Sequence, residues 1–202
     1  ALNYYKTAAD SGCIQAMYDY ARLLNSYKDT KNDPSVSYYY KMAADKGHVR
    51  SMHEYAKRAY LGRGVNVNKE EAACYFKMAV DNGDVDSIHD YAIMLSGGIG
   101  VPVNKKEAAR LYRLSIDKKG DTKSIVNLAI MLEKGDGIPK NQKEATSLYQ
   151  AAIQKGDNRA MNNYACMLYS SENKKDAANY YKMSAEKGNS KAMHNYAVML
   201  DK

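Results

Sequence analysis

Three histidines that recur at one position of successive helical segments have the most evident capacity for chemistry. His53, His89 and His194 each lie two residues before a Tyr–Ala pair, and imidazole rings repeated in this way could bind a metal ion or respond to pH near neutrality. Equivalent residues of adjacent helical hairpins are about 8–10 Å apart. Two histidines at that distance are too far apart to bind one metal ion easily, and no carboxylate or thiol completes a usual ligand set. We therefore expect solvated histidines and no metal site.

The cysteines give no stronger sign of chemistry. Cys13, Cys74 and Cys166 are far apart in sequence and match no Cys-x-x-Cys or Cys/His zinc spacing. The sequence implies no histidine and acid partner for Cys166, and the carboxylates fall mostly at loops, caps or solvent-facing helix positions. We expect free structural thiols, no catalytic activity and no cofactor.

Three loops contain Gly-x-Gly and could be mistaken for phosphate-binding loops. They span residues 62–68, 98–104 and 135–141, and no strand precedes them and no Gly-Lys-Ser/Thr follows them. A turn explains them better, because glycine adopts positive φ readily and the following Val or Ile can pack against the hairpin. We therefore expect no nucleotide binding at these loops.

Glycines at a regular interval divide the chain into repeats. Their spacings are 35, 36, 37, 36 and 32 residues, and the series is Gly12, Gly47, Gly83, Gly120, Gly156 and Gly188. An aromatic side chain precedes each glycine, and an alanine follows each one nine positions later, at Ala21, Ala56, Ala92, Ala129, Ala165 and Ala197. A side chain limited to one methyl group at the same place in every copy indicates that helices cross closely there. The sequence thus predicts a repeat of about 36 residues.

Within each repeat the apolar residues have helical spacing. Met52, Tyr55, Ala56 and Ala59 fall at i, i+3, i+4 and i+7, and the segment that begins at Ala72 repeats the pattern. Polar residues stand where helix N-caps are needed, at Asp33, Asn68, Asn104 and Asn141. Each repeat is therefore predicted to be a pair of amphipathic helices.

Composition agrees with a thin, extended molecule. The chain has 45% hydrophobic and 26% charged residues, with no Trp, one Phe, 19 Tyr and 11 Met. Tyr must supply much of the core, and its hydroxyl needs water or a partner, which favours a solenoid over a thick globule. No apolar run is long enough to span a membrane. The lack of any Asn-x-Ser/Thr sequence favours a cytosolic or nuclear compartment, and of these we expect the cytoplasm.

These motifs together resemble the Sel-1-like repeats, which are close relatives of tetratricopeptide repeats. The resemblance covers essentially the whole chain and rests on Met52, Tyr55, Ala56, Gly62, Gly64, Val65, Glu71, Ala72, Tyr75, Phe76, Lys77, Ala79, Gly83 and their counterparts. It implies an all-α solenoid of antiparallel helix pairs, about 12 helices in a right-handed superhelix. We expect a single array over 1–202, with half-repeats at 1–12 and 189–202 and full repeats at 13–47, 48–83, 84–120, 121–156 and 157–188. We also expect the chain to be a segment of a longer protein.

The resemblance to tetratricopeptide arrays implies a binding groove lined by the first helix of each pair. Carried over by position, the candidate groove residues are Tyr18, Arg22, His53, Lys57, Tyr60, His89, Ile93, Val126, Ile130, Asn162, Cys166, Tyr169 and His194. An apolar strip flanked by cationic and polar residues would fit a peptide or partner helix with apolar anchors and some acidic character. The alternative is that Val126 and Ile130 simply pack against the adjacent repeat.

The expected function is a non-catalytic scaffold or adaptor that binds a protein or peptide. The net charge of +7 raises the alternative of single-stranded RNA binding, because pentatricopeptide repeats have nearly this length. Many lysines, however, recur near helix C-termini, where positive charge complements the helix dipole. The Gly-x-Gly-Val loop is also foreign to those RNA-binding repeats. Nucleic acid is therefore the less favoured partner, and the sequence does not predict an oligomeric state.

Overall fold

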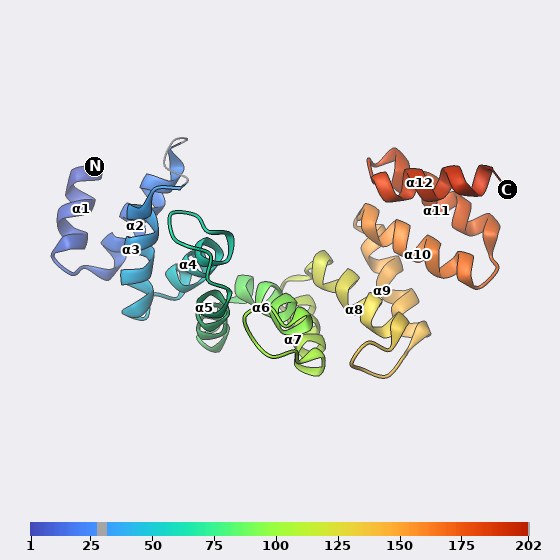
Figure 1. Ribbon diagram of the computed structural model, residues 1–202, viewed down its shortest axis with the longest axis horizontal. Helices are drawn as coiled ribbons and strands as arrows, with labels where there is room; N and C mark the ends of the chain where they lie inside the picture. Colours follow the sequence, from blue (N-terminus) through green and yellow to red (C-terminus); the bar gives the residue numbers. More distant parts are fainter. Residues whose placement is uncertain (28–31, 202) are drawn as a thin grey trace. The chain divides into compact units, whose positions relative to one another are not determined.

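The structure is a computed structural model that describes residues 1–27 and 32–201. It is built from helices alone in the part of the chain that it describes, and helices that pack on each other in sequence, such as α4 and α5 or α10 and α11, run antiparallel (Figure 1). The twelve described helices are α1 (Leu2–Asp10), α2 (Ile14–Ser26), α3 (Pro34–Asp45), α4 (Val49–Leu61), α5 (Lys69–Asp81), α6 (Val85–Gly97), α7 (Lys105–Lys119), α8 (Thr122–Lys134), α9 (Gln142–Gln154), α10 (Asn158–Ser170), α11 (Lys174–Glu186) and α12 (Ser190–Leu200). The predicted all-α array of helix pairs is confirmed.

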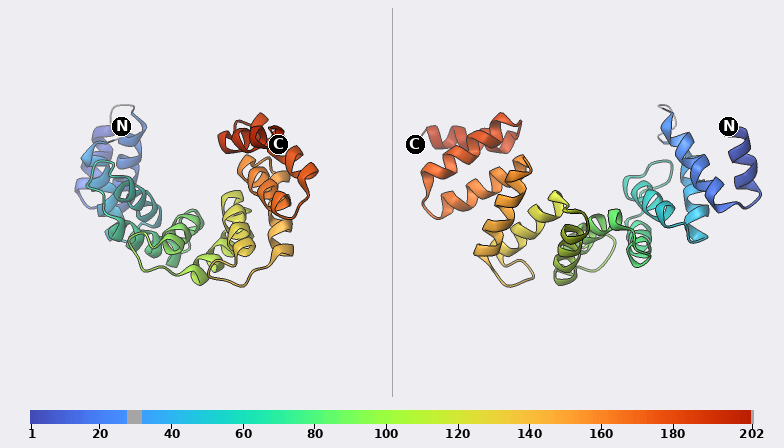
Figure 2. Two further views of the ribbon diagram at one scale, coloured as in Figure 1. Left: turned by 45° about the vertical axis from the view of Figure 1, so that its right-hand side comes forward. Right: turned by 180° about the vertical axis from the view of Figure 1, so that it is seen from behind.

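The chain forms two compact units, Ala1–Ala108 and Ala109–Lys202, here called unit 1 and unit 2. In unit 1, α2 packs on α3 and α4 on α5, and each pair also contacts the next helix along the chain. In unit 2, α8 packs on α9 and α10 on α11, with α12 against α11 (Figure 2). Each unit therefore repeats the same local arrangement of a first and a second helix.

The predicted caps start the second helices. The side chain of Asp33 accepts a hydrogen bond from the backbone N–H of Ser35, and Asn68 accepts one from Glu71. Asn104 and Asn141 do the same in the next two repeats, for Glu107 and Glu144. Because the first N–H groups of a helix have no partner within it, these side chains fix where the second helices begin.

The alanine that recurs in every first helix is enclosed except at the last helix. Ala21, Ala56 and Ala92 have no exposed surface in unit 1, and Ala129 and Ala165 have none in unit 2. The preceding tyrosines pack edge-on against a tyrosine of the second helix, with ring centroids 4.8 Å apart for Tyr20–Tyr39, 4.9 Å for Tyr55–Tyr75 and 5.0 Å for Tyr164–Tyr180. In these three repeats the core is thus an alanine crossing point beside a tyrosine pair.

The Gly-x-Gly loops also connect repeats, which the sequence did not predict. The glycine φ is positive at Gly64 (68°) and Gly100 (67°). A Cβ atom at Gly64 would lie 2.5 Å from the carbonyl oxygen of Asp33, and one at Gly100 would overlap the carbonyl of Lys69. Each of these two loops therefore lies directly on the start of the preceding repeat's second helix. Only glycine leaves room for this approach.

Candidate functional site

One set of predicted groove residues connects adjacent repeats instead of facing an open surface. This set occupies the fifth position of the first helices and comprises Tyr18, His53, His89, Val126 and Asn162, whereas His194 at the same position of the last helix is exposed. The Tyr18 ring lies 4.6 Å from the ring of His48 in the next repeat. Nδ1 of His53 lies 2.8 Å from Oγ of Ser87 and 3.5 Å from Oδ2 of Asp84, again in the next repeat. The expectation of a solvated groove histidine is therefore wrong for His53.

Burial makes the same correction for three further residues. His89 is 9% exposed, Val126 is 1% exposed and Asn162 is 6% exposed. The carboxamide oxygen of Asn162 accepts a hydrogen bond from Nδ2 of Asn195 at 3.2 Å. These side chains lie beneath the surface and do not form it. For Val126 the structure therefore favours packing against its neighbours over exposure in a groove.

Residues four positions later in the first helices reach the surface. Arg22 is exposed, and Lys57, Ile93, Ile130 and Cys166 are half-buried. In unit 1 two of them, Lys57 and Ile93, line a pocket of about 240 Å³ between α4, α5 and α6. The full lining of this pocket, here called the unit 1 pocket, is Lys57, Tyr60, Leu61, Phe76, Asp90, Ile93 and Met94. Three residues that the sequence selected thus meet at one site.

The unit 1 pocket has an apolar interior and two opposite charges at its edge. Five of its seven lining side chains are apolar or aromatic, and the ring of Tyr60 is covered by the ammonium group of Lys69, 3.4 Å from its centroid. The ammonium group of Lys57 lies 3.6 Å from a carboxylate oxygen of Glu54. The charged residues of the lining are Lys57 and Asp90, so the pocket offers apolar contacts with one cationic and one anionic group beside them.

A second, more polar cleft lies in unit 2. It has a volume of about 430 Å³ and is lined by Val126, Asn127, Ile130, Asn158, Arg159, Asn162, Asn163, Gly188, Asn189, Ser190 and Lys191. It draws on α8, α10 and the start of α12, which are the first helices of three successive repeats. Ile130 and Asn162 are its predicted members besides Val126. The asparagines at positions 127, 158, 163 and 189 were not predicted, although their recurrence in the sequence could have indicated them.

The remaining predicted residues join neither surface. Arg22 lies 3.6 Å from Asp19 on its own helix. Tyr169 and Cys166 pack against the cluster around Tyr181, whose hydroxyl lies 3.2 Å from the Cys166 sulfur. His194 is exposed on α12. In the described part of the chain no three His, Cys, Asp or Glu side chains are grouped so as to hold a metal ion.

Sequence reasoning missed one buried cation. Arg58 is 4% exposed and stands where α6, α8 and α10 have Met94, Met131 and Met167. Its guanidinium donates to Oγ of Ser37 at 2.5 Å, to Oδ1 of Asn25 at 3.1 Å and to the carbonyl of Asp33 at 3.1 Å. Burial lowers the pKa of Arg58. An arginine at a position that is Leu or Met in the other first helices was the available signal.

The comparisons with known proteins decide the family. The model of the Sel1 repeat family matches residues 1–13, 14–48, 49–84, 85–119, 122–157 and 158–189. This chain belongs to the Sel1 repeat family. The helix pairs of this Sel1 repeat chain have the same fold as those of tetratricopeptide proteins. A search of curated proteins found no match.

Solved structures show the same fold at low identity. A Sel1 repeat protein from Oxalobacter formigenes aligns with a TM-score of 0.76 and 21% identity, covering 100% of this chain and 91% of that one. A protective antigen of uropathogenic Escherichia coli with an SLR fold aligns with a TM-score of 0.80 and 24% identity over 100% of this chain. The Sel1 chain spans 44% of that antigen. The tetratricopeptide protein YrrB, described as having an unusual peptide-binding site, aligns at 0.68 and 16% identity over 96% of this chain and 98% of its own.

The helices described for the Sel1 chain include none that is both long and apolar enough to cross a membrane.

Proposed function

We propose that this Sel1 repeat chain is a non-catalytic scaffold that binds a peptide or partner protein on the face formed by its first helices. The unit 1 pocket carries the proposal, because Lys57, Tyr60 and Ile93 were selected by repeat position and line one concavity. Apolar hollows with a few charged groups at the edge are typical sites for an anchoring side chain of a partner. The proposed ligand therefore inserts an apolar side chain between α4 and α6.

The charges at the pocket edge suit a partner segment of mixed character. Lys57 and Asp90 come from different first helices and carry opposite charges beside the apolar interior. A helix or extended peptide whose apolar anchor is flanked by one acidic and one basic residue would complement them. The similarity of this fold to that of YrrB, the protein described as having an unusual peptide-binding site, supports a peptide as the ligand.

Single-stranded RNA is the second candidate, on the basis of the net charge of +7 and the repeat length. RNA-binding repeats stack bases on exposed aromatic faces. In the unit 1 pocket the face of Tyr60 is covered by Lys69, and Phe76 is 2% exposed. The aromatic rings there are therefore not available as stacking platforms, which favours a protein ligand.

For the compartment we propose the cytoplasm. Cys13, Cys74 and Cys166 are all free, and two of them are exposed. Exposed free thiols persist in reducing compartments and tend to oxidise outside the cell. Thiol labelling of the protein isolated from its source should find all three cysteines reduced; a disulfide-linked form as the main species would argue against the cytoplasm.

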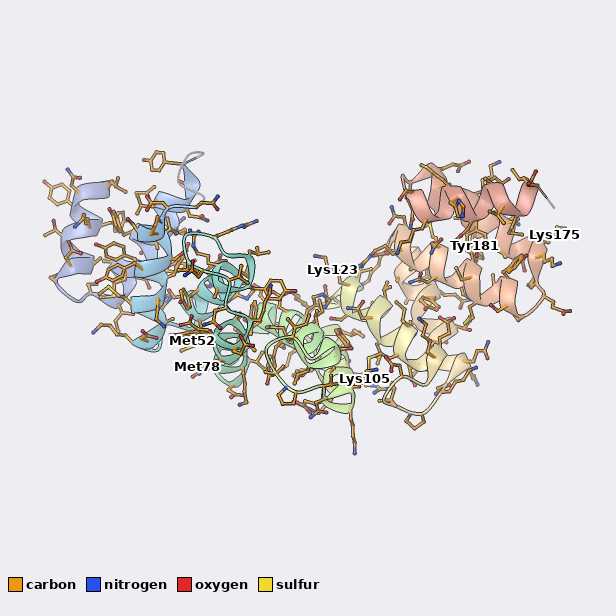
Figure 3. All side chains as sticks on the ribbon, in the orientation of Figure 1. Met52, Met78, Lys105, Lys123, Lys175 and Tyr181 are labelled. Atoms are coloured by element: carbon orange, nitrogen blue, oxygen red, sulfur yellow. The ribbon has the colours of Figure 1, made fainter. Side chains whose placement is uncertain are left out.

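Selection of random peptides on phage tests the pocket directly. Peptides enriched on the wild-type protein should share an apolar anchor and bind the Ile93→Glu variant at least about tenfold more weakly, because a carboxylate in an apolar pocket is poorly solvated. Met78→Glu is the matched control, since Met78 is on the surface of α5 and outside the pocket (Figure 3). Enriched peptides that bind Ile93→Glu as tightly as wild type would refute the proposed site.

A further inference from the structure

The polar cleft of unit 2 has two asparagines at matching positions of successive repeats. Asn127 on α8 and Asn163 on α10 each stand directly before the buried large residue of the first helix, Leu128 or Tyr164. Both line the cleft. Equivalent residues of neighbouring repeats are about 8–10 Å apart, which is about three residues of extended chain at roughly 3.3 Å each.

The two side chains offer complementary hydrogen-bonding groups. Asn163 accepts from Nδ2 of Asn162 at 3.2 Å, so its oxygen is engaged and its own amide group remains available as a donor. Asn127 donates to the hydroxyl of Tyr112 at 3.3 Å, so its oxygen remains available as an acceptor. One free donor and one free acceptor at this spacing match a carbonyl and an N–H of an extended main chain. Asn162, which is held by Asn195, fixes the orientation of Asn163 from below.

The cleft is also electropositive. Arg159 and Lys191 lie on it, and both are exposed. Arg159 has its nearest carboxylate at 3.4 Å on Asp157, whose other oxygen already caps α10. Lys191 has no ion-pair partner among residues 1–27 and 32–201. The N-terminal turns of α10 and α12 also line the cleft, and helix N-termini favour negatively charged groups nearby.

The positive charge of the chain is concentrated in the segment that contains this cleft. Residues 1–108 contain 14 basic and 13 acidic residues, and residues 109–202 contain 16 basic and 10 acidic residues. The first segment thus has a net charge of +1 and the second +6, which together make the +7 of the whole chain. A surface with this charge attracts acidic ligands from solution.

We infer that the unit 2 cleft binds an acidic peptide in extended conformation. The peptide main chain lies across Asn127 and Asn163, and an Asp or Glu side chain lies against Arg159 and Lys191. This inference rests on the proposed scaffold function but uses residues separate from the unit 1 pocket. RNA fits the cleft less well, because no lining residue is aromatic and bases would have no platform to stack on.

Fluorescence anisotropy with two peptide probes tests the inference. The first probe is a fluorescein-labelled peptide of alternating glutamate, serine and glycine, and the second replaces every glutamate by glutamine. Wild-type protein should bind the glutamate probe about tenfold more tightly. Arg159→Gln and Lys191→Gln should each weaken the glutamate probe by about threefold to fivefold and leave the glutamine probe unchanged.

The asparagine contact has its own readout. Asn163→Leu has nearly the same shape and should weaken both probes by about fivefold, because it removes a main-chain hydrogen bond that does not depend on the peptide's charge. Lys175→Gln is the matched control: it removes the same charge from unit 2 at the exposed start of α11, outside the cleft (Figure 3). It should leave both affinities unchanged.

Three results would overturn the inference: equal binding of the two probes, an equal effect of Lys175→Gln and Lys191→Gln, or displacement of the glutamate probe by poly(U) at lower concentration than by unlabelled peptide. Ile93→Glu, in the unit 1 pocket, should leave the glutamate probe bound. Failure of this inference and failure of the proposed pocket are therefore separate outcomes.

Discussion

The hydroxyl of Tyr39 donates a hydrogen bond of 2.6 Å to the carboxylate of Asp10, which ends the second helix of the preceding repeat. One repeat later the hydroxyl of Tyr75 donates to Asp45 in the same way. A lysine four residues before each aspartate, Lys6 or Lys41, completes the contact. The second helices of unit 1 are thus linked by a recurring Tyr–Asp–Lys junction in addition to their apolar packing.

Removing one junction hydroxyl should cost measurable stability. Tyr75→Phe keeps the ring, which is 7% exposed, and deletes the hydrogen bond to Asp45. We expect a loss of about 1 kcal/mol in the free energy of unfolding, as for a typical partly buried hydrogen bond. Urea denaturation followed by circular dichroism measures it. Tyr38→Phe is the control, because Tyr38 is 58% exposed, and equal effects of the two changes would show that the junction contributes nothing.

The same junction predicts a pH dependence. The hydrogen bond from Lys6, and then that from Tyr39, lowers the pKa of Asp10 below its ordinary value. A carboxyl group with a lowered native pKa stabilises the fold above its unfolded pKa of about 3.9, and the effect is lost as the pH falls through the native pKa. Wild type should therefore exceed Asp10→Asn in urea midpoint at neutral pH, and the difference should shrink below about pH 4. A difference that persists unchanged at the acid end would contradict this assignment.

The sequence predicted the repeat, the helix pairs and the caps well because these depend on local spacing. Gly47, Asn68 and Ala56 carry that information within a few residues of where they act. The rotation of each first helix about its axis depends on the neighbouring repeat, which local spacing does not specify. Consequently His53 was placed in the groove with Lys57, although the structure turns its ring onto Ser87 and leaves Lys57 at the surface.

Gly100 should be far more sensitive to substitution than Gly83, although both have positive φ. The φ angles are 67° and 86°. A Cβ at Gly83 meets no atom within 4 Å, whereas one at Gly100 overlaps the backbone of Lys69 and Glu70. Gly83→Ala should cost about 1 kcal/mol of backbone strain, and Gly100→Ala about 2–3 kcal/mol because the loop must also move away. Thermal unfolding of the two variants compares them, and equal costs would mean that the loop approach contributes no stability.

Arg58 offers a test of whether a buried cation or its volume matters to the repeat. Arg58→Met installs the residue found at the equivalent positions 94, 131 and 167. It removes a guanidinium whose burial opposes its charge, as the lowered pKa of Arg58 indicates. Ser37 keeps its hydrogen bond to the carbonyl of Arg63 at 2.7 Å. We therefore expect Arg58→Met to change the free energy of unfolding by no more than about 1 kcal/mol, since well-packed apolar replacements of buried ions are often neutral.

Arg58→Ala is the matched comparison, because it removes the same charge and also leaves a cavity. It should cost about 2–3 kcal/mol more than Arg58→Met, the range for truncating a large buried side chain. Urea denaturation of both variants, at a pH where wild type unfolds reversibly, gives the two free energies. If Met were as damaging as Ala, the three hydrogen bonds to Ser37, Asn25 and Asp33 would be what the repeat requires. The methionines at positions 94, 131 and 167 would then be poor guides to what position 58 needs.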